Sequence, residues 1–329
     1  MAGIKILGTG YYVPENIVKN EDFAKIVETS DEWITTRTGI KERHLVTDET
    51  TWQMGVYAAK QALDRARLSA GEVDLIIFTT CTPDFFSPSM SCLVQREIGA
   101  FSAMCIDVNC ACTGFVYGLD MARRYLLTGD VKTVLMVSSE GLSKLTDFSD
   151  RSTCVLFGDG AGALAVQKEE NALYSSFLKA DSRNAGVLFA RALHNGHPFG
   201  GSAVQADDFV PGNQHYLYMN GKEVYKFAIK AMPEAVTGAC KKIGLSVSEL
   251  DWIIPHQANV RIVETAAQKL QFPSEKIYVN LQNYGNTSSA SIAIALHEMD
   301  EKGLLQKGQK LCIVGFGAGL TYGAAVFEW

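Results

Sequence analysis

Three candidate catalytic residues occupy similar positions along the chain: Cys112, His256 and Asn286. Cys112 follows a short apolar run and precedes a run with helical spacing, so it lies where a strand is expected to end and a helix to begin. Unpaired N–H groups and the helix dipole at such a position favour the thiolate, which is the nucleophilic form of cysteine. A buried core cysteine is the alternative interpretation, because free cysteine is among the most buried residue types.

His256 and Asn286 lie at the same kind of junction. His256 follows the apolar run Trp252-Ile253-Ile254-Pro255 and precedes a run with helical spacing. Asn286 belongs to a polar turn with N-cap residues, and this turn leads into another apolar helix. Catalytic groups gather at the carboxyl ends of strands in layered α/β folds, so we expect the three junctions to form one site.

An internal repeat explains how these junctions meet. Residues 68–77 align without gaps on residues 245–254, an offset of 245 − 68 = 177, and six of the ten positions are identical. At the same offset Cys112 falls on Ser289. We therefore predict two homologous halves about a pseudo-twofold axis, each a βαβ-type unit with a mostly parallel sheet, and a site between them.

Ordered motifs extend along almost the whole chain, from about Gly8 to the C-terminus. They are Thr29-Ser30-Asp31-Glu32-Trp33-Ile34, Arg37-Thr38-Gly39-Ile40, Cys112-Thr113-Gly114-Phe115, Phe157-Gly158-Asp159-Gly160-Ala161-Gly162-Ala163, His256-Gln257-Ala258-Asn259, Gly285-Asn286-Thr287-Ser288 and Gly315-Phe316-Gly317-Ala318-Gly319-Leu320-Thr321. Together they resemble the motifs of β-ketoacyl-acyl carrier protein synthase III.

The resemblance implies a thiolase fold, which is an α/β architecture of five layers, αβαβα, built from two homologous halves, and it implies a homodimer. We expect the half with the nucleophilic cysteine to cover residues 1–170, and the half with the histidine and asparagine to cover residues 171–329. The stretch from about 186 to 220 has no counterpart in the repeat. It is expected to be an insertion, over the acyl tunnel or simply on the surface.

The reaction implied by the resemblance is a decarboxylative Claisen condensation that initiates fatty acid synthesis. An acyl group from acyl-CoA is loaded on Cys112, CoA leaves, and malonyl-acyl carrier protein loses carbon dioxide to give the carbanion that attacks the acyl-enzyme. Both thioesters are substrates, and no cofactor is implied. His256 and Asn286 resemble the pair that donates hydrogen bonds to the malonyl thioester oxygen, which requires a neutral histidine with its proton on Nε2.

A second oxyanion site, for the acyl-enzyme carbonyl, would use the backbone N–H groups of Cys112 and Ala318. Many relatives have glycine where this chain has Ala318. Alanine keeps the N–H group but disfavours positive φ, so we expect Ala318 at negative φ.

Positions that bind CoA also follow from the resemblance. Trp33, Arg37 and Arg151 match the positions that hold the adenine between an indole and a guanidinium. Thr29 and Asn259 match polar positions along the nucleotide and pantetheine path. Without the family, Trp33 and Arg37 are four residues apart and are also compatible with a solvated pair on one helix.

Three positions match the acyl pocket and one matches the docking surface for the carrier protein. Leu142 and Phe157 would form the sides of the pocket, and Ser87 would lie on a loop that crosses the dimer interface to close the partner's pocket. Phenylalanine is common there in acetyl-preferring members, so Ser87 predicts longer or more branched primers. Arg261 matches the docking position, where a cation meets an acidic carrier helix, and an ordinary surface arginine is the alternative.

Composition excludes other classes of function. A net charge of −6 gives no electrostatic footprint for nucleic acid or an anionic membrane. No apolar stretch approaches the length of a membrane span, and the first ten residues have no apolar signal core, so eight cysteines predict reduced thiols in a cytoplasmic protein. The spacing of Cys105, Cys110 and Cys112 matches no common zinc pattern, and we expect no metal.

Four other functions are compatible with parts of the sequence. A papain-like hydrolase would share the order Cys, His, Asn, but its signature around the cysteine is missing. A degradative thiolase would need a second catalytic cysteine near the C-terminus, and the turn Gly315-Phe316-Gly317-Ala318-Gly319 contains none. A related acyltransferase or condensing enzyme of secondary metabolism shares the fold and the three residues, and it is the main alternative. A non-catalytic binding protein would not need all three.

Overall fold

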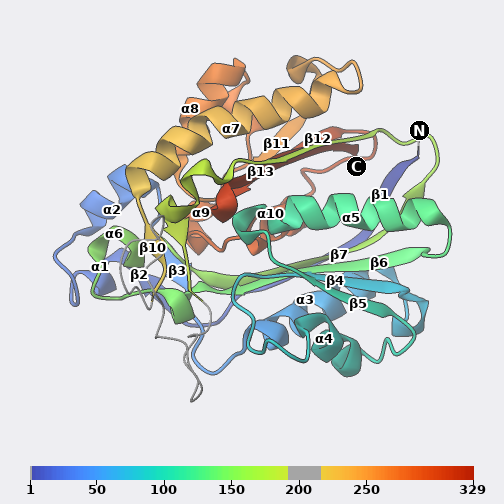
Figure 1. Ribbon diagram of the computed structural model, residues 1–329, viewed down its shortest axis with the longest axis horizontal. Helices are drawn as coiled ribbons and strands as arrows, with labels where there is room; N and C mark the ends of the chain where they lie inside the picture. The colour runs from blue at the N-terminus through green and yellow to red at the C-terminus, as the bar shows by residue number, and fades with distance from the viewer. Residues whose placement is uncertain (1, 192–215) are drawn as a thin grey trace, which may run out of the picture.

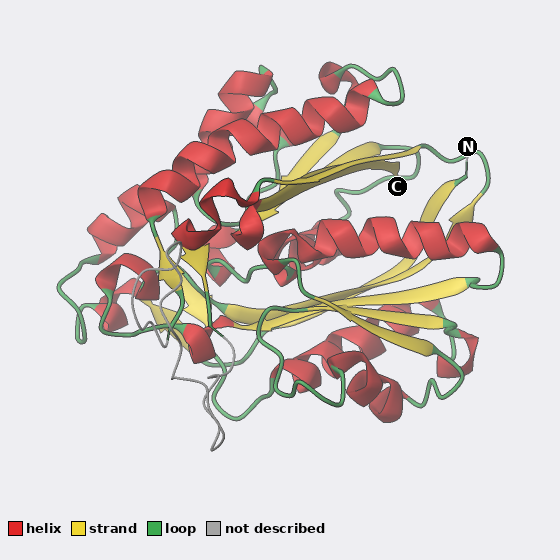
Figure 2. Ribbon diagram, viewed as in Figure 1, coloured by secondary structure: helices red, strands yellow, loops and turns green. Residues whose placement is uncertain are grey.

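The computed structural model describes residues 2–191 and 216–329, which form five layers (Figure 1, Figure 2). Two helices cover the outer face of each of two sheets, and a further pair of helices lies between the sheets. From one outer layer to the other, these helices are α3 (Thr51–Ala66) and α4 (Met90–Ile98), α5 (Gly114–Thr128) and α10 (Ala290–Glu301), and α7 (Gly221–Lys241) and α8 (Val260–Leu270). The predicted αβαβα architecture is therefore confirmed.

The first sheet has five strands in the order β1-β7-β6-β4-β5. They are β1 (Gly3–Tyr12), β4 (Leu75–Thr79), β5 (Met104–Val108), β6 (Thr133–Gly141) and β7 (Asp159–Glu169). Strand β4 pairs in parallel with β5 and β6, whereas β7 pairs antiparallel with β6 and β1. Every residue of β4 and β6 is buried, because helices cover both faces of the sheet.

The second sheet repeats this order with four strands, β11-β12-β13-β8. They are β8 (Tyr174–Ala180), β11 (Trp252–Pro255), β12 (Lys310–Gly317) and β13 (Thr321–Glu328). Strands β11 and β12 are parallel, and the other two pairs are antiparallel, as in the first sheet. The offset of 177 relates the first residues of β4 and β11, 75 and 252, and those of β6 and β12, 133 and 310.

Both sheets are mixed, so the prediction of a mostly parallel sheet in each half is wrong. Strands β7 and β13 follow β6 and β12 without a helix that crosses the sheet, and an antiparallel return needs no such crossover. The expected boundary at 170/171 falls in the turn between β7 and β8.

The central helices belong to a core that both halves share. Nine of the twelve residues of α10 are buried, which is typical of a helix enclosed on all sides. Its small residues allow the first sheet to approach closely: a Cβ at Gly162 of β7 would lie 2.4 Å from the Cβ of Ala293. Since this core contains β4 and β6 as well as β11 and β12, neither half buries its inner face alone.

Short elements form a cap at the end of the molecule opposite the termini (Figure 1). They are β2 (Ile17–Lys19), α1 (Asn20–Phe23), α2 (Asp31–Thr38), β3 (Glu42–His44), α6 (Arg151–Cys154) and α9 (Leu281–Tyr284). Helix α2 begins where Ser30 accepts a hydrogen bond from the N–H group of Trp33, and it ends at Gly39, whose φ of 83° suits glycine. A small core around Phe23 and Ile34 holds these elements together.

Part of the expected insertion at 186–220 is described. Strands β9 (Leu188–Phe189) and β10 (Tyr218–Met219) pair antiparallel, while residues 192–215 lie outside the described residues. Among the helices that the structure describes, none combines the length and apolar character needed to span a bilayer.

Candidate active site

A cavity of about 820 Å³ opens between the two halves and the cap. Cys112, His256 and Asn286 all line it, so the structure brings the three predicted catalytic residues together. Of the other predicted site residues, those that also line it are Trp33, Arg37, Leu142, Phe157, Asn259 and Ala318.

Cys112 lies in a single 3₁₀ turn, Ala111–Thr113, which runs directly into α5. The end of β12 packs against this turn: a Cβ at Gly317 would lie 2.8 Å from the backbone nitrogen of Cys112. Only glycine allows this approach, which brings the loop that contains Ala318 beside the thiol. Ala318 is not among the residues with positive φ, so the predicted negative φ is confirmed.

The thiol of Cys112 is not acidified in the free site. Burial raises its pKa from the ordinary 9.0 to about 12, and the Glu140 carboxylate adds to the rise. Hydrogen bonds from the Ser288 hydroxyl and from the backbone lower the pKa, but they do not offset the loss of water. The expectation that the helix N-terminus favours a thiolate is therefore wrong, and the thiol is protonated at neutral pH.

His256 directly follows β11 and is almost fully buried, with 1% of its surface exposed. Burial lowers its pKa from 6.5 to about 3, although a hydrogen bond with the Ser288 backbone acts in the opposite direction. The ring is thus neutral at physiological pH, as the proposed chemistry requires.

The hydrogen bonds around Ser291 favour one tautomer of His256. The Ser291 hydroxyl oxygen lies 2.8 Å from His256 Nδ1 and accepts a bond from the N–H group of Gln257 at 3.2 Å. The hydroxyl proton has no other acceptor among the described residues, so it is donated to Nδ1. The ring proton then resides on Nε2.

Asn286 is oriented in a comparable way. Its backbone bridges to Phe157, donating to the Leu156 carbonyl at 2.9 Å and accepting from Gly158 at 3.0 Å. Its side-chain Oδ1 accepts a hydrogen bond from the Ser288 N–H group at 2.9 Å. The acceptor end of the amide is thereby occupied, and the Nδ2 donors remain for a ligand in the cavity.

The residues of the predicted adenine clamp lie together at the mouth of the cavity. The guanidinium carbons of Arg37 and Arg151 lie 4.5 Å and 4.9 Å from the centre of the Trp33 ring. Arg151 also donates to the carbonyl of Glu28 at 2.8 Å. It does not line the cavity, so an adenine would enter the clamp by displacing Arg151 from the indole face.

Thr29 and Asn259 differ in whether their side-chain polar atoms already have hydrogen-bond partners. The hydroxyl of Thr29 is buried without a hydrogen-bond partner among the described residues. In Asn259, Oδ1 caps α8 by accepting from the N–H group of Arg261 at 2.9 Å, and Nδ2 donates to the Arg37 carbonyl at 3.0 Å. The amide of Asn259 therefore fixes the position of Arg37.

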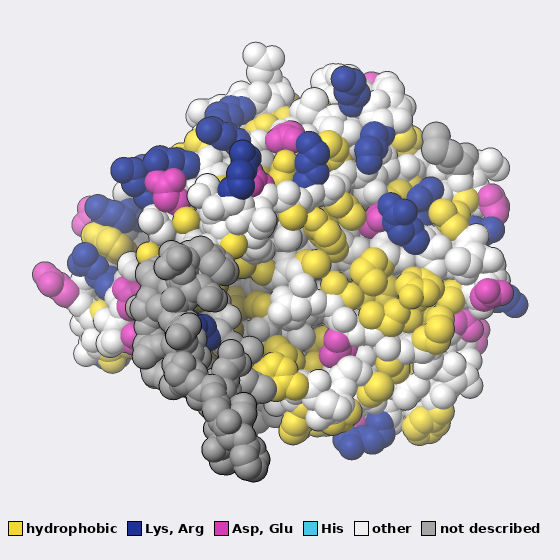
Figure 3. All heavy atoms as spheres, viewed as in Figure 1, with side chains coloured by type: hydrophobic (Ala, Val, Ile, Leu, Met, Phe, Trp, Pro, Cys, Tyr) yellow, Lys and Arg dark blue, Asp and Glu magenta, His cyan; other side chains and the backbone are white. Residues whose placement is uncertain are grey.

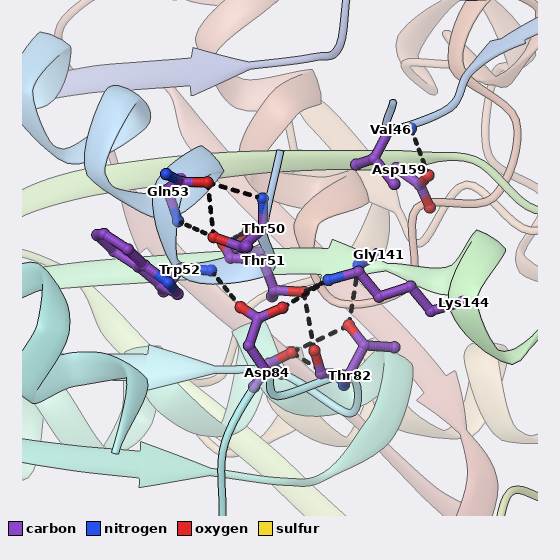
Figure 4. Close-up of polar contacts among 12 residues, drawn as sticks. Val46, Thr50, Thr51, Trp52, Gln53, Thr82, Asp84, Gly141, Lys144 and Asp159 are labelled. Carbon is purple, nitrogen blue, oxygen red and sulfur yellow. Dashed lines mark hydrogen bonds and ion pairs between the residues drawn. The ribbon is translucent and has the colours of Figure 1, made fainter. Parts of the chain in front are cut away.

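Ser87 lies apart from the cavity of its own chain. It is exposed, as are its neighbours Phe85 and Phe86, with 50% and 68% of their surfaces accessible. The loop is anchored at Asp84, which pairs with Lys144 at 2.6 Å and accepts from the Trp52 N–H group (Figure 4). Leu142 and Phe157 are buried and line the cavity.

Arg261 is exposed at the first turn of α8, outside the cavity. Basic side chains gather on the surface over α7 and α8 (Figure 3). The exposed ones on these helices are Lys222, Lys226, Lys230, Lys241, Arg261 and Lys269. Within residues 2–191 and 216–329, no group of three or more His, Cys, Asp or Glu side chains is arranged to hold a metal ion.

Sequence reasoning missed the residues that hold the site in place. Ser288, Ser291 and Glu140 contact the catalytic side chains or their supports, and none of them belongs to an apolar periodic pattern that marks a core position. Cys81, a second thiol lining the cavity, was also missed. The polar run that includes Ser288 and Ser289 was the only available signal, and it was interpreted as a cap.

Comparisons with known proteins agree with this geometry. Family models match residues 106–183, as 3-oxoacyl-[acyl-carrier-protein (ACP)] synthase III, and residues 240–329, as its C-terminal part. The β-ketoacyl-[acyl-carrier-protein] synthase III of Clostridium acetobutylicum is 47% identical over 330 residues, covering 100% of this chain and 99% of that protein.

Solved structures show the same fold. The 3-oxoacyl-[acyl-carrier-protein] synthase III of Aquifex aeolicus VF5 matches with a TM-score of 0.91 and 43% identity, covering 99% of this chain and 100% of that chain. The priming β-ketosynthase of the R1128 polyketide biosynthetic pathway matches with a TM-score of 0.90 and 32% identity, covering 99% and 96%. The predicted thiolase fold is confirmed by these neighbours.

Proposed function

The chain belongs to the 3-oxoacyl-[acyl-carrier-protein] synthase III family and is a condensing enzyme that initiates fatty acid synthesis; we propose that Cys112, His256 and Asn286 carry its decarboxylative Claisen condensation. The observation that carries this proposal is the arrangement of the two donors. Ser291 occupies Nδ1 of His256 and Ser288 occupies Oδ1 of Asn286, so the donors that a substrate oxygen can meet are Nε2–H of His256, which the Ser288 backbone also faces, and Nδ2–H of Asn286.

In the first half-reaction, the sulfur of Cys112 attacks the carbonyl of acyl-CoA, and the C–S bond to CoA breaks. Because the pKa of the thiol is about 12, the proton leaves Cys112 during this step and ends on the departing CoA thiol. The tetrahedral oxyanion is stabilised by the N–H groups of Cys112 and Ala318. One thioester replaces another, so the step has little thermodynamic cost.

In the second half-reaction, malonyl-acyl carrier protein loses carbon dioxide, and the electron pair of the broken C–C bond forms an enolate. Its oxygen receives hydrogen bonds from His256 Nε2 and Asn286 Nδ2, two oriented donors that together contribute several kcal/mol. The enolate carbon then attacks the acyl group on Cys112, and the sulfur leaves and is reprotonated. A neutral His256 suits this role, because its Nε2–H group donates a hydrogen bond without the ring carrying a charge in the buried site.

The two substrates use different parts of the surface in this proposal. CoA binds at the mouth, where Trp33 and Arg37 hold the adenine and Arg151 moves aside to close over it. Thr29 lies just before α2, and its buried hydroxyl would have to turn outward to meet the nucleotide. The acidic carrier protein docks on the basic surface over α7 and α8, which includes Arg261 (Figure 3).

We also propose that the enzyme is a homodimer formed through β5. This strand ends the first sheet and has one unpaired edge, and the exposed Phe101 and Met104 lie at its start. Hydrophobic side chains gather on this side of the molecule in Figure 3. A second copy paired there would bring its loop with Ser87 towards the acyl pocket, whose other walls are Leu142 and Phe157.

Primary metabolism is favoured over secondary metabolism. Identity to the curated fatty acid enzymes reaches 47%, against 32% for the polyketide priming enzyme. The proposed reaction needs no resident cofactor or metal, since both thioesters are substrates. The eight cysteines are all free, which supports a reducing compartment, the cytoplasm.

The test separates the half-reactions. Cys112→Ala should abolish acyl loading and condensation but leave decarboxylation of malonyl-acyl carrier protein, because the two donors survive. His256→Ala should still be acylated by acyl-CoA, as seen by intact mass spectrometry, and should lose decarboxylation. If His256→Ala blocked acylation while decarboxylation persisted, the proposed roles would be refuted.

A further inference from the structure

Glu140, at the end of β6, is a buried carboxylate with no assigned role in the reaction. None of its surface is exposed, and no ion pair to it occurs among the described residues. An unpaired buried carboxylate is costly unless hydrogen bonds replace its water shell. Its partners therefore indicate what the charge is for.

The two oxygens of Glu140 bind two different halves of the protein. Oε2 accepts from the segment that leaves β4, namely Thr80 Oγ1 at 3.1 Å, the Cys81 N–H group at 3.0 Å and Thr82 Oγ1 at 2.9 Å. Thr82 is in turn fixed by the N–H group of Gly141 (Figure 4). Oε1 accepts from Ser289, through Oγ at 2.7 Å and the N–H group at 3.4 Å.

Ser289 adjoins the residue that orients both proposed oxyanion donors. The N–H group of Ser288 donates to Asn286 Oδ1 at 2.9 Å, and the Ser288 backbone is also hydrogen-bonded to His256. Ser288 has a φ of 49°, a conformation that costs free energy for a non-glycine residue and persists only when its surroundings hold it. The bonds from Ser289 to Glu140 supply that constraint from the other half.

We propose that Glu140 is a positioning residue for the decarboxylation step, holding the turn from Asn286 to Ser289 so that the donors on His256 and Asn286 converge on one oxygen. This inference rests on the proposed function. It assigns the hydrogen bonds of Glu140 to the decarboxylation step, because none of them reaches Cys112 or the loop that contains Ala318. The charge of Glu140 acts on Cys112 only by raising the pKa of its thiol.

The charge of Glu140 makes the expected effect directional. The carboxylate raises the pKa of Cys112, in addition to the larger effect of burial. Neutralising it removes an obstacle to thiolate formation. A variant without the charge should therefore load acyl groups at least as well as the native protein while it loses decarboxylation.

The experiment compares Glu140→Gln, which exchanges one acceptor oxygen for an NH2 donor, and Ser289→Ala, which removes the Oγ donor to Oε1, with their double variant. Decarboxylation of malonyl-acyl carrier protein should fall about tenfold or more in each, while acyl loading of Cys112 from acyl-CoA stays within about threefold. The double variant should be no worse than Glu140→Gln alone, because both changes break one contact. Thr80→Val is the matched control: it removes a bond to the other oxygen and should keep both rates within about threefold.

The results distinguish this proposal from the proposed function. If the native protein shows neither half-reaction, the proposed function fails. If the native protein shows both half-reactions, three results would each overturn the role of Glu140. Glu140→Gln and Ser289→Ala could lower decarboxylation and acyl loading equally, Thr80→Val could lower decarboxylation alone, or the losses of the two single variants could add in the double variant. Should Glu140→Gln not fold, Ser289→Ala alone gives the same comparison without a charge change.

Discussion

Replacing Ser291 with alanine tests whether the tautomer of His256 is set by this hydroxyl. Ser291 is 2% exposed and lies on α10, the helix shared by both halves. Its oxygen accepts from the N–H group of Gln257 and its proton is donated to His256 Nδ1. The alanine variant leaves both groups without a partner and removes the constraint that keeps the proton on Nε2.

The size of the effect follows from these two contacts. A buried polar group that loses its partner costs about 1–3 kcal/mol, so two such groups should lower the free energy of unfolding by about 2–6 kcal/mol. In the reaction, loss of one oriented donor to the enolate corresponds to about 1–2 kcal/mol, a decrease of roughly 5- to 30-fold in decarboxylation. Acyl loading of Cys112 should change little, since it does not use the histidine proton.

Decarboxylation of malonyl-acyl carrier protein, acyl loading by intact mass and denaturant unfolding measure the three quantities. Ring ¹⁵N shifts of His256 report the tautomer directly. Ser175→Ala is the control, because that serine is also buried and donates to the Ala239 carbonyl at 2.8 Å, far along the chain from the site. Undiminished decarboxylation in Ser291→Ala, or an equal loss in Ser175→Ala, would refute the reasoning.

Three other predictions concern pH, CoA and primer size. Because the pKa of His256 is lowered from 6.5 to about 3, decarboxylation by Cys112→Ala should stay level from pH 8 to about pH 5. Because of the same shift, the unfolded chain takes up a proton at His256 more readily than the native state does. The native state is therefore not destabilised by this group above pH 6.5, and its free energy of unfolding falls by about 2 kcal/mol at about pH 5. Urea unfolding of His256→Gln should not show this loss. Arg37→Ala should raise KM for acyl-CoA with little change in kcat, and an unchanged KM would contradict the clamp. The native enzyme should have a higher kcat/KM for isobutyryl- or hexanoyl-CoA than for acetyl-CoA, and Ser87→Phe should shift the preference to acetyl-CoA. A strong preference of the native protein for acetyl-CoA would show that another residue closes the pocket.

The main architecture was predictable because it is recorded in local patterns. Apolar runs marked β4, β6 and β11, and the repeat of 177 residues related their positions across the halves. Cys112 and His256 were found because each follows a strand and precedes a helix. The expectation of a third such junction is wrong for Asn286, which follows the short helix α9, and the polar turn before α10 was the signal that found it. Strand direction was not predictable in the same way: β7 is as apolar as a parallel strand, and only its connection to β6 decides its orientation.

The state of the site depended on contacts between residues far apart in the chain. A helix N-terminus alone favours a thiolate, but at Cys112 burial and Glu140 outweigh it. His256 is neutral because it is buried, its Nδ1 is held by Ser291, which is 35 residues away, and the contact of Ser289 with Glu140 spans 149 residues. Such pairings leave no periodic trace in the sequence.

The duplicated architecture bears on how such a site can arise. At the offset of 177, Cys112 corresponds to Ser289 and His256 corresponds to Thr79, whereas Asn286 corresponds to Asn109, so the two halves differ at the cysteine and histidine positions and agree at the asparagine. A symmetric pair of identical half-length chains would place the same side chain at both members of each pair. Only after fusion into one gene product can one copy keep a nucleophile while the other supplies the donors. The cavity between the halves is thus a product of broken symmetry, in which the unused counterpart of Cys112 was free to become support, as Ser289 has.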